Sequence, residues 1–67
     1  MASGVRHIED YEVIDVFKHL HGEIQWVTAG FLLSDLLRVV DSNAKHKLAD
    51  LIERGLLRHD RGWLSVP

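Results

Sequence analysis

The chain of 67 residues contains no cysteine and no long hydrophobic run. Without cysteine, the fold gains no stability from disulfides or from a thiolate metal site, and the absence fits a cytoplasmic protein. No apolar run approaches the ~18 residues that a membrane-spanning helix needs. The N-terminal sequence, MASGVRHIED, is not that of a signal peptide. We therefore expect no membrane partner.

The chain also lacks the excess of positive charge that is typical of nucleic-acid-binding domains. Ten acids against eight bases give a formal net charge of −2. The distribution is uneven, because residues 1–36 hold two bases and six acids, whereas residues 37–67 hold six bases and four acids. The second half is therefore the candidate for binding nucleic acid, although a split of this size also arises by chance.

A chain of this length forms one small domain, residues 1–67, with no room for a second core. Apolar residues make up 46 % of it, which is enough for a core and too many for a disordered chain. We expect residues 1–7 to be flexible and the core to span about 8–66. A core of this size is marginal, so a homodimer contact or another protein partner is expected to add stability.

The first half predicts two helices joined by a short extended segment. Apolar residues recur at helical spacing over 8–21, acids gather near the start of this segment, and Gly22 is placed to end the helix. Residues 23–27 alternate polar and apolar and predict a short strand or linker. Thr28 is the expected N-cap of a second helix over 29–38, with Gly30 in its first turn. Its expected buried stripe is Phe31, Leu32, Leu33, Leu36 and Leu37.

The second half predicts a turn, a third helix and a hairpin. Two valines followed by three capping residue types mark a turn over 39–43, with Asp41 or Ser42 as the helix cap. The helix is expected over about 43–54, with Gly55 as its stop. Strands over 56–59 and 63–66 follow, joined by a turn at 60–62. The expected inward stripe of the helix is Ala44, Leu48, Leu51 and Ile52.

Several of these residues form a pattern known from one superfamily. They are Leu33 and Leu37 in the second helix, Val39 in the turn, Ser42-Asn43-Ala44 at the start of the third helix, and Glu53-Arg54-Gly55-Leu56-Leu57 before a basic hairpin. Over about 8–66 the chain resembles the winged helix-turn-helix superfamily of bacterial, archaeal and phage transcription regulators. The resemblance implies an α+β, mainly α fold with three helices and a short C-terminal β-hairpin wing. Two features depart from the pattern, because Arg38 replaces a usual turn glycine and the hairpin loop is short.

The resemblance also implies sequence-specific binding to double-stranded DNA and a role in transcription regulation. The helix at about 42–54 would enter the major groove, and the hairpin 57–66 would lie on the flanking backbone. Asn43 suits bidentate contact with adenine, and the lysines suit guanine acceptors or phosphates. The candidate DNA-binding residues are Ser42, Asn43, Lys45, His46, Lys47, Arg58 and Arg61.

Each of these candidates also has a structural interpretation. The polar residues at the start of the third helix fit capping, the lysines fit a solvated face, and the hairpin arginines fit protection of an edge strand. Asp50 and Glu53 lie further along the same helix and would repel phosphate. The alternative function is a winged-helix module for protein–protein contact within a larger assembly, without direct DNA contact.

The sequence offers no motif for catalysis or for a cofactor. His19 and His21 are two residues apart and point to different sides of a helix, so they make a poor metal site. We expect no enzyme activity, no metal, no cofactor and no small-molecule effector. Trp26 and Trp63 are expected to be packing residues, with a dimer surface as the alternative for Trp63. The predicted location is the cytoplasm, on the nucleoid if the protein binds DNA.

Overall fold

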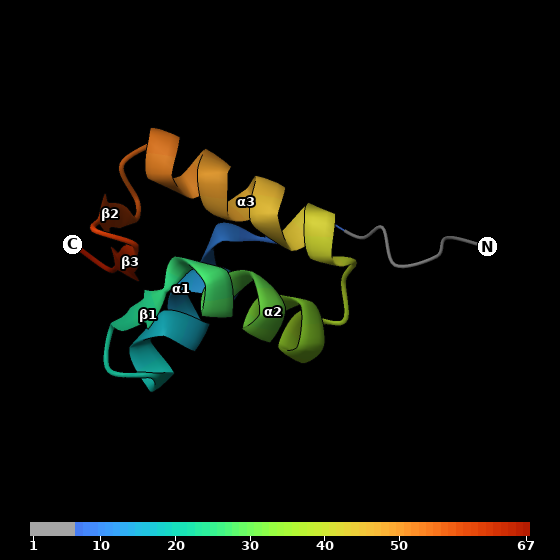
Figure 1. Ribbon diagram of the computed structural model, residues 1–67. Helices are drawn as coiled ribbons and strands as arrows, with labels where there is room; N and C mark the ends of the chain where they lie inside the picture. The colour runs from blue at the N-terminus through green and yellow to red at the C-terminus, as the bar shows by residue number, and fades with distance from the viewer. Residues whose placement is uncertain (1–6) are drawn as a thin grey trace.

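The computed structural model describes residues 7–67, so the predicted flexibility of the first seven residues falls, except for His7, outside the described part. Its elements follow the order α1 (Asp10–His19), β1 (Glu23–Gln25), α2 (Trp26–Leu37), α3 (Asp41–Glu53), β2 (Arg58–Asp60) and β3 (Trp63–Ser65). The predicted class, α+β and mainly α, is confirmed, with three helices and a short C-terminal hairpin in a winged helix-turn-helix layout. The strands gather at one end of α2 and α3, and the turn between these helices lies at the other end (Figure 1).

The first helix is shorter than the sequence predicted. It starts at Asp10, and Glu12 accepts a hydrogen bond through Oε2 from the backbone N–H of Glu9 at 2.8 Å. The predicted role of Gly22 is confirmed, because its φ is 83° and its N–H donates to the Phe17 carbonyl at 2.7 Å. His21 also takes a positive φ, 65°, which extends the left-handed turn by one residue.

The second helix begins earlier than expected, and Thr28 does not cap it. Strand β1 runs directly into α2, whose N-cap is Gln25 and whose first residue is Trp26. The Trp26 N–H donates to the Gly62 carbonyl at 2.8 Å, so the hairpin satisfies one of the backbone donors that have no partner within the helix. Gly30 consequently lies beyond the first turn and is buried, where a Cβ would stand 3.2 Å from Cγ of Lys45.

The turn between α2 and α3 forms without the usual glycine. Arg38 adopts the left-handed conformation, with φ 56° and ψ 50°, and its N–H donates to the Ser34 carbonyl. The Ser34 hydroxyl donates to the Val39 carbonyl at 2.8 Å, and the Val39 side chain is buried as predicted. An arginine therefore takes a geometry that is less strained for glycine.

The third helix corrects the predicted cap and confirms the predicted stop. It begins at Asp41 after the N-cap Val40, and no side chain caps it, so neither Asp41 nor Ser42 has that role. Asp41 instead places a carboxylate in the first turn, where the helix dipole favours negative charge. Gly55 ends the helix with φ 81° and donates its N–H to the Ile52 carbonyl at 3.1 Å.

The sheet has three antiparallel strands in the order β1-β3-β2, so the segment before α2 joins the hairpin. The strands start and end within one or two residues of the predicted bounds. Arg61 and Gly62, with φ 51° and 82°, form a two-residue turn with the positive φ values of type I′. Ile24, Leu64 and His59 are paired across the sheet and share its inner face. The His59 ring stacks on Trp26, with ring centroids 5.6 Å apart.

The core lies between the three helices and the inner face of the sheet. The predicted inward stripe of α3 is confirmed, since Ala44, Leu48 and Leu51 are fully buried and Ile52 packs beside them. The remaining buried apolar residues are Ile8, Val13, Phe17, Ile24, Ala29, Leu33, Val39, Leu57 and Leu64. Among residues 7–67, no helix has the length and apolar character required to cross a bilayer.

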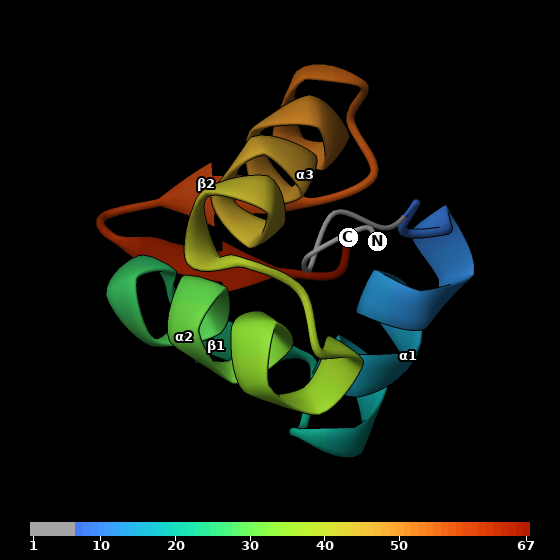
Figure 2. The same ribbon diagram turned by 90° about the vertical axis from the view of Figure 1, so that its right-hand side faces the viewer.

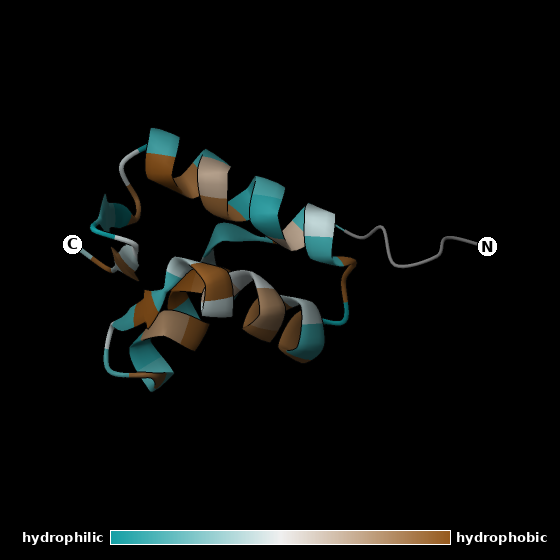
Figure 3. Ribbon diagram, viewed as in Figure 1, coloured by the Kyte–Doolittle hydropathy of each residue, from teal (hydrophilic) through white to brown (hydrophobic). Residues whose placement is uncertain are grey.

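The wide buried stripe predicted for α2 is wrong. Leu33 is fully buried, but Phe31 and Leu36 are 74 % and 55 % exposed, and Leu32 and Leu37 are only partly buried. Helix α2 is the most apolar of the three helices (Figure 3). Its apolar residues occupy more of the helix circumference than one core contact can cover, so some of them remain exposed.

Candidate nucleic-acid interface

The surface of α3 is set by its buried stripe. Because Ala44, Leu48 and Leu51 face the core, a helix of about 3.6 residues per turn directs the opposite positions outward. Those outward positions are Ser42, His46, Ala49 and Glu53, and all of them are exposed. The outward face therefore presents small and polar groups over its first two turns and a carboxylate near its end.

Lys45 lies on the flank of α3 that faces α2. Its side chain is 55 % exposed, and its Nζ is 3.1 Å from a carboxylate oxygen of Asp41 on the preceding turn. The position beside Gly30 places the alkyl part of Lys45 along the groove between α2 and α3. Lys45 therefore takes a surface position, as predicted, but its charge has a partner.

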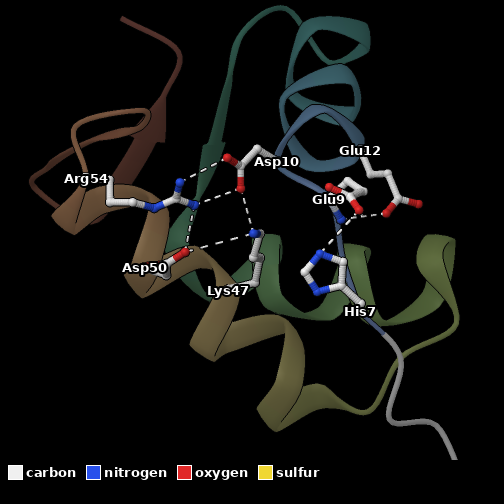
Figure 4. Close-up of polar contacts among 7 residues, drawn as sticks. All are labelled: His7, Glu9, Asp10, Glu12, Lys47, Asp50 and Arg54. Carbon is white, nitrogen blue, oxygen red and sulfur yellow. Dashed lines mark hydrogen bonds and ion pairs between the residues drawn. The ribbon is translucent and has the colours of Figure 1, made fainter.

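Lys47 lies on the opposite flank, and its predicted outward position is wrong. Its side chain is only 15 % exposed, and its Nζ approaches Oδ1 of Asp10 at 2.6 Å. A second carboxylate, that of Asp50, lies 3.9 Å from the same nitrogen. Figure 4 shows the Lys47 ammonium directed toward the start of α1. The fold brings Lys47 and Asp10 together although they are 37 residues apart in the sequence.

Arg54 completes this cluster at the C-terminal end of α3. Its Nη2 donates to Oδ1 of Asp10 at 2.7 Å and to Asp50 at 2.7 Å, while its Nη1 donates to Oδ2 of Asp10 at 3.0 Å. The Arg54 and Lys47 hydrogen bonds hold the pKa of Asp10 well below its ordinary value. The Asp10 and Asp50 hydrogen bonds raise the pKa of Arg54 above its ordinary value. The cluster ties α1 to α3 through a bidentate pair (Figure 4).

This cluster is not visible in the sequence. Asp10 is one of the acids predicted near the start of the first helix, and in the first turn of α1 the helix dipole favours its negative charge. The partners Lys47 and Arg54 lie 37 and 44 residues further along the chain, and no local pattern pairs positions so far apart.

Asn43 and His46 lie beside the residues that precede α1. Together with His7, Ile8 and Lys47 they line a shallow hollow of about 240 Å³ beside the first turns of α3. Asn43 is half-buried there, whereas His46 is exposed. The residue proposed for bidentate contact with adenine thus lies beside the segment that precedes α1, and His46 lies between this flank and the outward face.

The hairpin separates its two arginines. Arg58 pairs with Ser65 across the sheet, on the outer face away from Leu64, whereas Arg61 is at the tip of the turn. Both side chains are exposed. The turn lies on the side of the molecule opposite α1 (Figure 2). Trp63, which was expected to pack, lies on the outer face of the sheet and is 43 % exposed.

The structure therefore divides the seven predicted contact residues. Ser42, Lys45 and His46 lie on or beside the outward face of α3, and Arg61 projects from the hairpin tip on the side away from α1. The other three are placed elsewhere: Asn43 and Lys47 on the flank toward α1, and Arg58 on the outer face of the sheet. Within residues 7–67, no three His, Cys, Asp or Glu side chains are arranged to hold a metal ion.

Comparison with protein-family models, curated proteins and solved structures found no match to this chain. The resemblance to winged-helix regulators therefore stays a prediction from the residue pattern. The fold adds an independent observation, because the order of helices and strands is the one that the pattern implies.

Proposed function

We propose that this protein binds double-stranded DNA sequence-specifically and acts as a small winged-helix transcription regulator. The observation that carries the proposal is the outward face of α3, which is exposed among residues 7–67. Its buried stripe locks the helix onto the core, while Ser42, His46 and Ala49 are exposed on the other side. A helix that enters a major groove must be held rigidly on one side and open on the other.

The contacts proposed here are fewer than the sequence suggested. Ser42 and His46 would reach base edges, Lys45 and Arg61 would neutralise phosphates, and Ala49 is small enough to let the helix approach closely. Lys45 can exchange Asp41 for a phosphate at little cost, because exposed ion pairs contribute only about 0–1 kcal/mol. Glu53 repels phosphate at the far end, so the N-terminal half of the helix would enter the groove.

Two lysines on the same helix offer a matched test. Lys45 is exposed at the α2–α3 edge, and Lys47 is paired with Asp10. A duplex is selected from a random-sequence library, and its affinity is measured against salt for wild type, Lys45→Ala and Lys47→Ala. We expect the slope of log K against log salt to shrink by about 0.9 for Lys45→Ala, the value of one lost phosphate contact.

Lys47→Ala is the matched control. We expect it to leave the salt slope unchanged and to lower the free energy of unfolding, because Asp10 loses one of its partners. Equal slopes for wild type and Lys45→Ala would refute the proposed contact. A slope changed only by Lys47→Ala would place the DNA on the flank near α1.

One observation favours a second candidate, protein contact without DNA. Val27 and Phe31 are 75 % and 74 % exposed and lie four residues apart on one face of α2. The cations of α3 are also paired with carboxylates. The absence of binding to random-sequence duplex at low salt, even at tens of micromolar protein, would favour this candidate.

The proposal has three consequences for the protein in the cell. A single module makes a small DNA interface, so we expect a homodimer or side-by-side binding on repeated sites. A DNA-binding regulator would act in the cytoplasm, on the nucleoid. Its control would come from protein concentration or from a partner.

A further inference from the structure

A second surface of the molecule lies between α1 and α2. Val16 of α1, Leu20 directly after it and Leu36 of α2 line a hollow of about 270 Å³, together with Asp15 and His19. Leu36 is 55 % exposed and Leu20 is 38 % exposed, so the apolar lining is open to solvent. We call this surface the α1–α2 groove.

The size and lining of the α1–α2 groove indicate the kind of group that it accepts. Pockets for small ligands usually measure about 300–1,000 Å³ and contain several polar groups that orient the ligand. This hollow is smaller, and its lining is mainly aliphatic. Such a hollow suits one or two apolar side chains of a protein segment, as when an amphipathic helix lies in a groove.

The charges within the two helices that form the α1–α2 groove are mostly negative. Helices α1 and α2 contain four carboxylates, those of Asp10, Glu12, Asp15 and Asp35, and a single lysine, Lys18. Asp10 is held by the ion cluster on the α3 side. Asp15 lines the groove directly, and Glu12 lies one helical turn before Val16 on the same side of α1. This surplus favours a partner with cationic side chains beside its apolar ones.

We propose that the α1–α2 groove binds an amphipathic helix of a partner protein, with leucine-like side chains in the hollow and Lys or Arg at its flanks. Charge complementarity argues against a second copy of this chain, because a two-fold contact would place Asp15 and its neighbours against the same acids. The β2–β3 turn lies on the side of the molecule opposite α1 (Figure 2). A partner in the groove therefore leaves the tip of the hairpin, with Arg61, accessible.

A displayed peptide library tests the proposal. Its members share a helical scaffold with leucines at i, i+3 and i+7, and their flanking positions are random. The full chain is the bait, and Leu36→Glu is the counter-selection bait, since Leu36 is exposed enough for the variant to fold. Leu56→Glu is the matched control, because Leu56 is 38 % exposed and lies outside the groove.

We expect the enriched peptides to carry Lys and Arg at their flanks. We also expect a loss of affinity of about tenfold or more for Leu36→Glu, which corresponds to about 1.4 kcal/mol, and none for Leu56→Glu. Enrichment of acidic flanks, no enrichment, or equal affinity for Leu36→Glu would overturn the proposal. Sedimentation that shows a dimer of the free protein abolished by Leu36→Glu would make a second copy the occupant and would also overturn it.

Discussion

Replacement of Leu48 by alanine tests the placement on which the proposed DNA interface depends. Leu48 lies in the middle of α3 and is fully buried, together with Ala44 and Leu51 on the same stripe. If these residues dock the helix, the opposite side of α3 is free for a ligand. The cost of the substitution therefore measures how firmly the helix is held.

The expected cost is large for a domain of this size. Truncation of leucine to alanine removes three carbon atoms, which is worth about 2.4 kcal/mol of transfer free energy at 0.8 kcal/mol per methylene. The cavity left behind brings the expected total to about 2.5–5 kcal/mol. A chain of 67 residues has a free energy of unfolding of only about 3–10 kcal/mol. We thus expect Leu48→Ala to remove a large share of the free energy of unfolding.

Urea unfolding followed by tryptophan fluorescence and by circular dichroism gives the measurement. The matched control is Leu36→Ala, the same truncation on α2 at a side chain that is 55 % exposed. We expect the control to change the free energy of unfolding by no more than about 1 kcal/mol. Similar small losses for both variants would show that Leu48 does not anchor α3, and the argument for its free outward face would fail.

Two further substitutions test the turn and the ion cluster. Arg38→Gly removes the strain of a left-handed arginine at the end of α2, so we expect the free energy of unfolding to rise by about 0.5–1 kcal/mol. Urea unfolding measures this change, and a loss of stability would show that Arg38 is not strained. For Asp10, the lowered pKa means that its stabilising effect is complete above the ordinary aspartate pKa of about 3.9 and is lost as the pH falls toward the folded-state pKa. Asp10→Asn should therefore lower stability at neutral pH and flatten its decline below about pH 5, and an unchanged acid profile would contradict the pairing.

Local sequence specifies the order of helices and strands and the positions at which glycine ends a helix. Gly22 and Gly55 end their helices with positive φ because a glycine pays no steric cost there. The stripe of Ala44, Leu48 and Leu51 was visible as a helical period, and it is buried as predicted. Such features depend on neighbours within one or two turns, so the chain alone specifies them.

The helix starts depended on contacts that the sequence does not display. The first residue of α2, Trp26, donates its N–H to the Gly62 carbonyl of the distant hairpin, and the helix begins there and not after the expected cap at Thr28. The exposure of Phe31 has the same kind of cause, because an apolar residue is buried only when another element covers its side of the helix. The apolar character of a residue is visible in the sequence, whereas the element that covers it is defined only by the fold.

The candidate interface shows most clearly which features local sequence specifies and which depend on the fold. The sequence alone specifies that polar and basic residues occur along α3, and these are the residues that we predicted to contact DNA. Folding leaves Lys45 at the surface and brings Lys47, two residues later, against Asp10. Charge interactions act through space, and the distance between α1 and α3 in the folded protein is not specified by the order of residues.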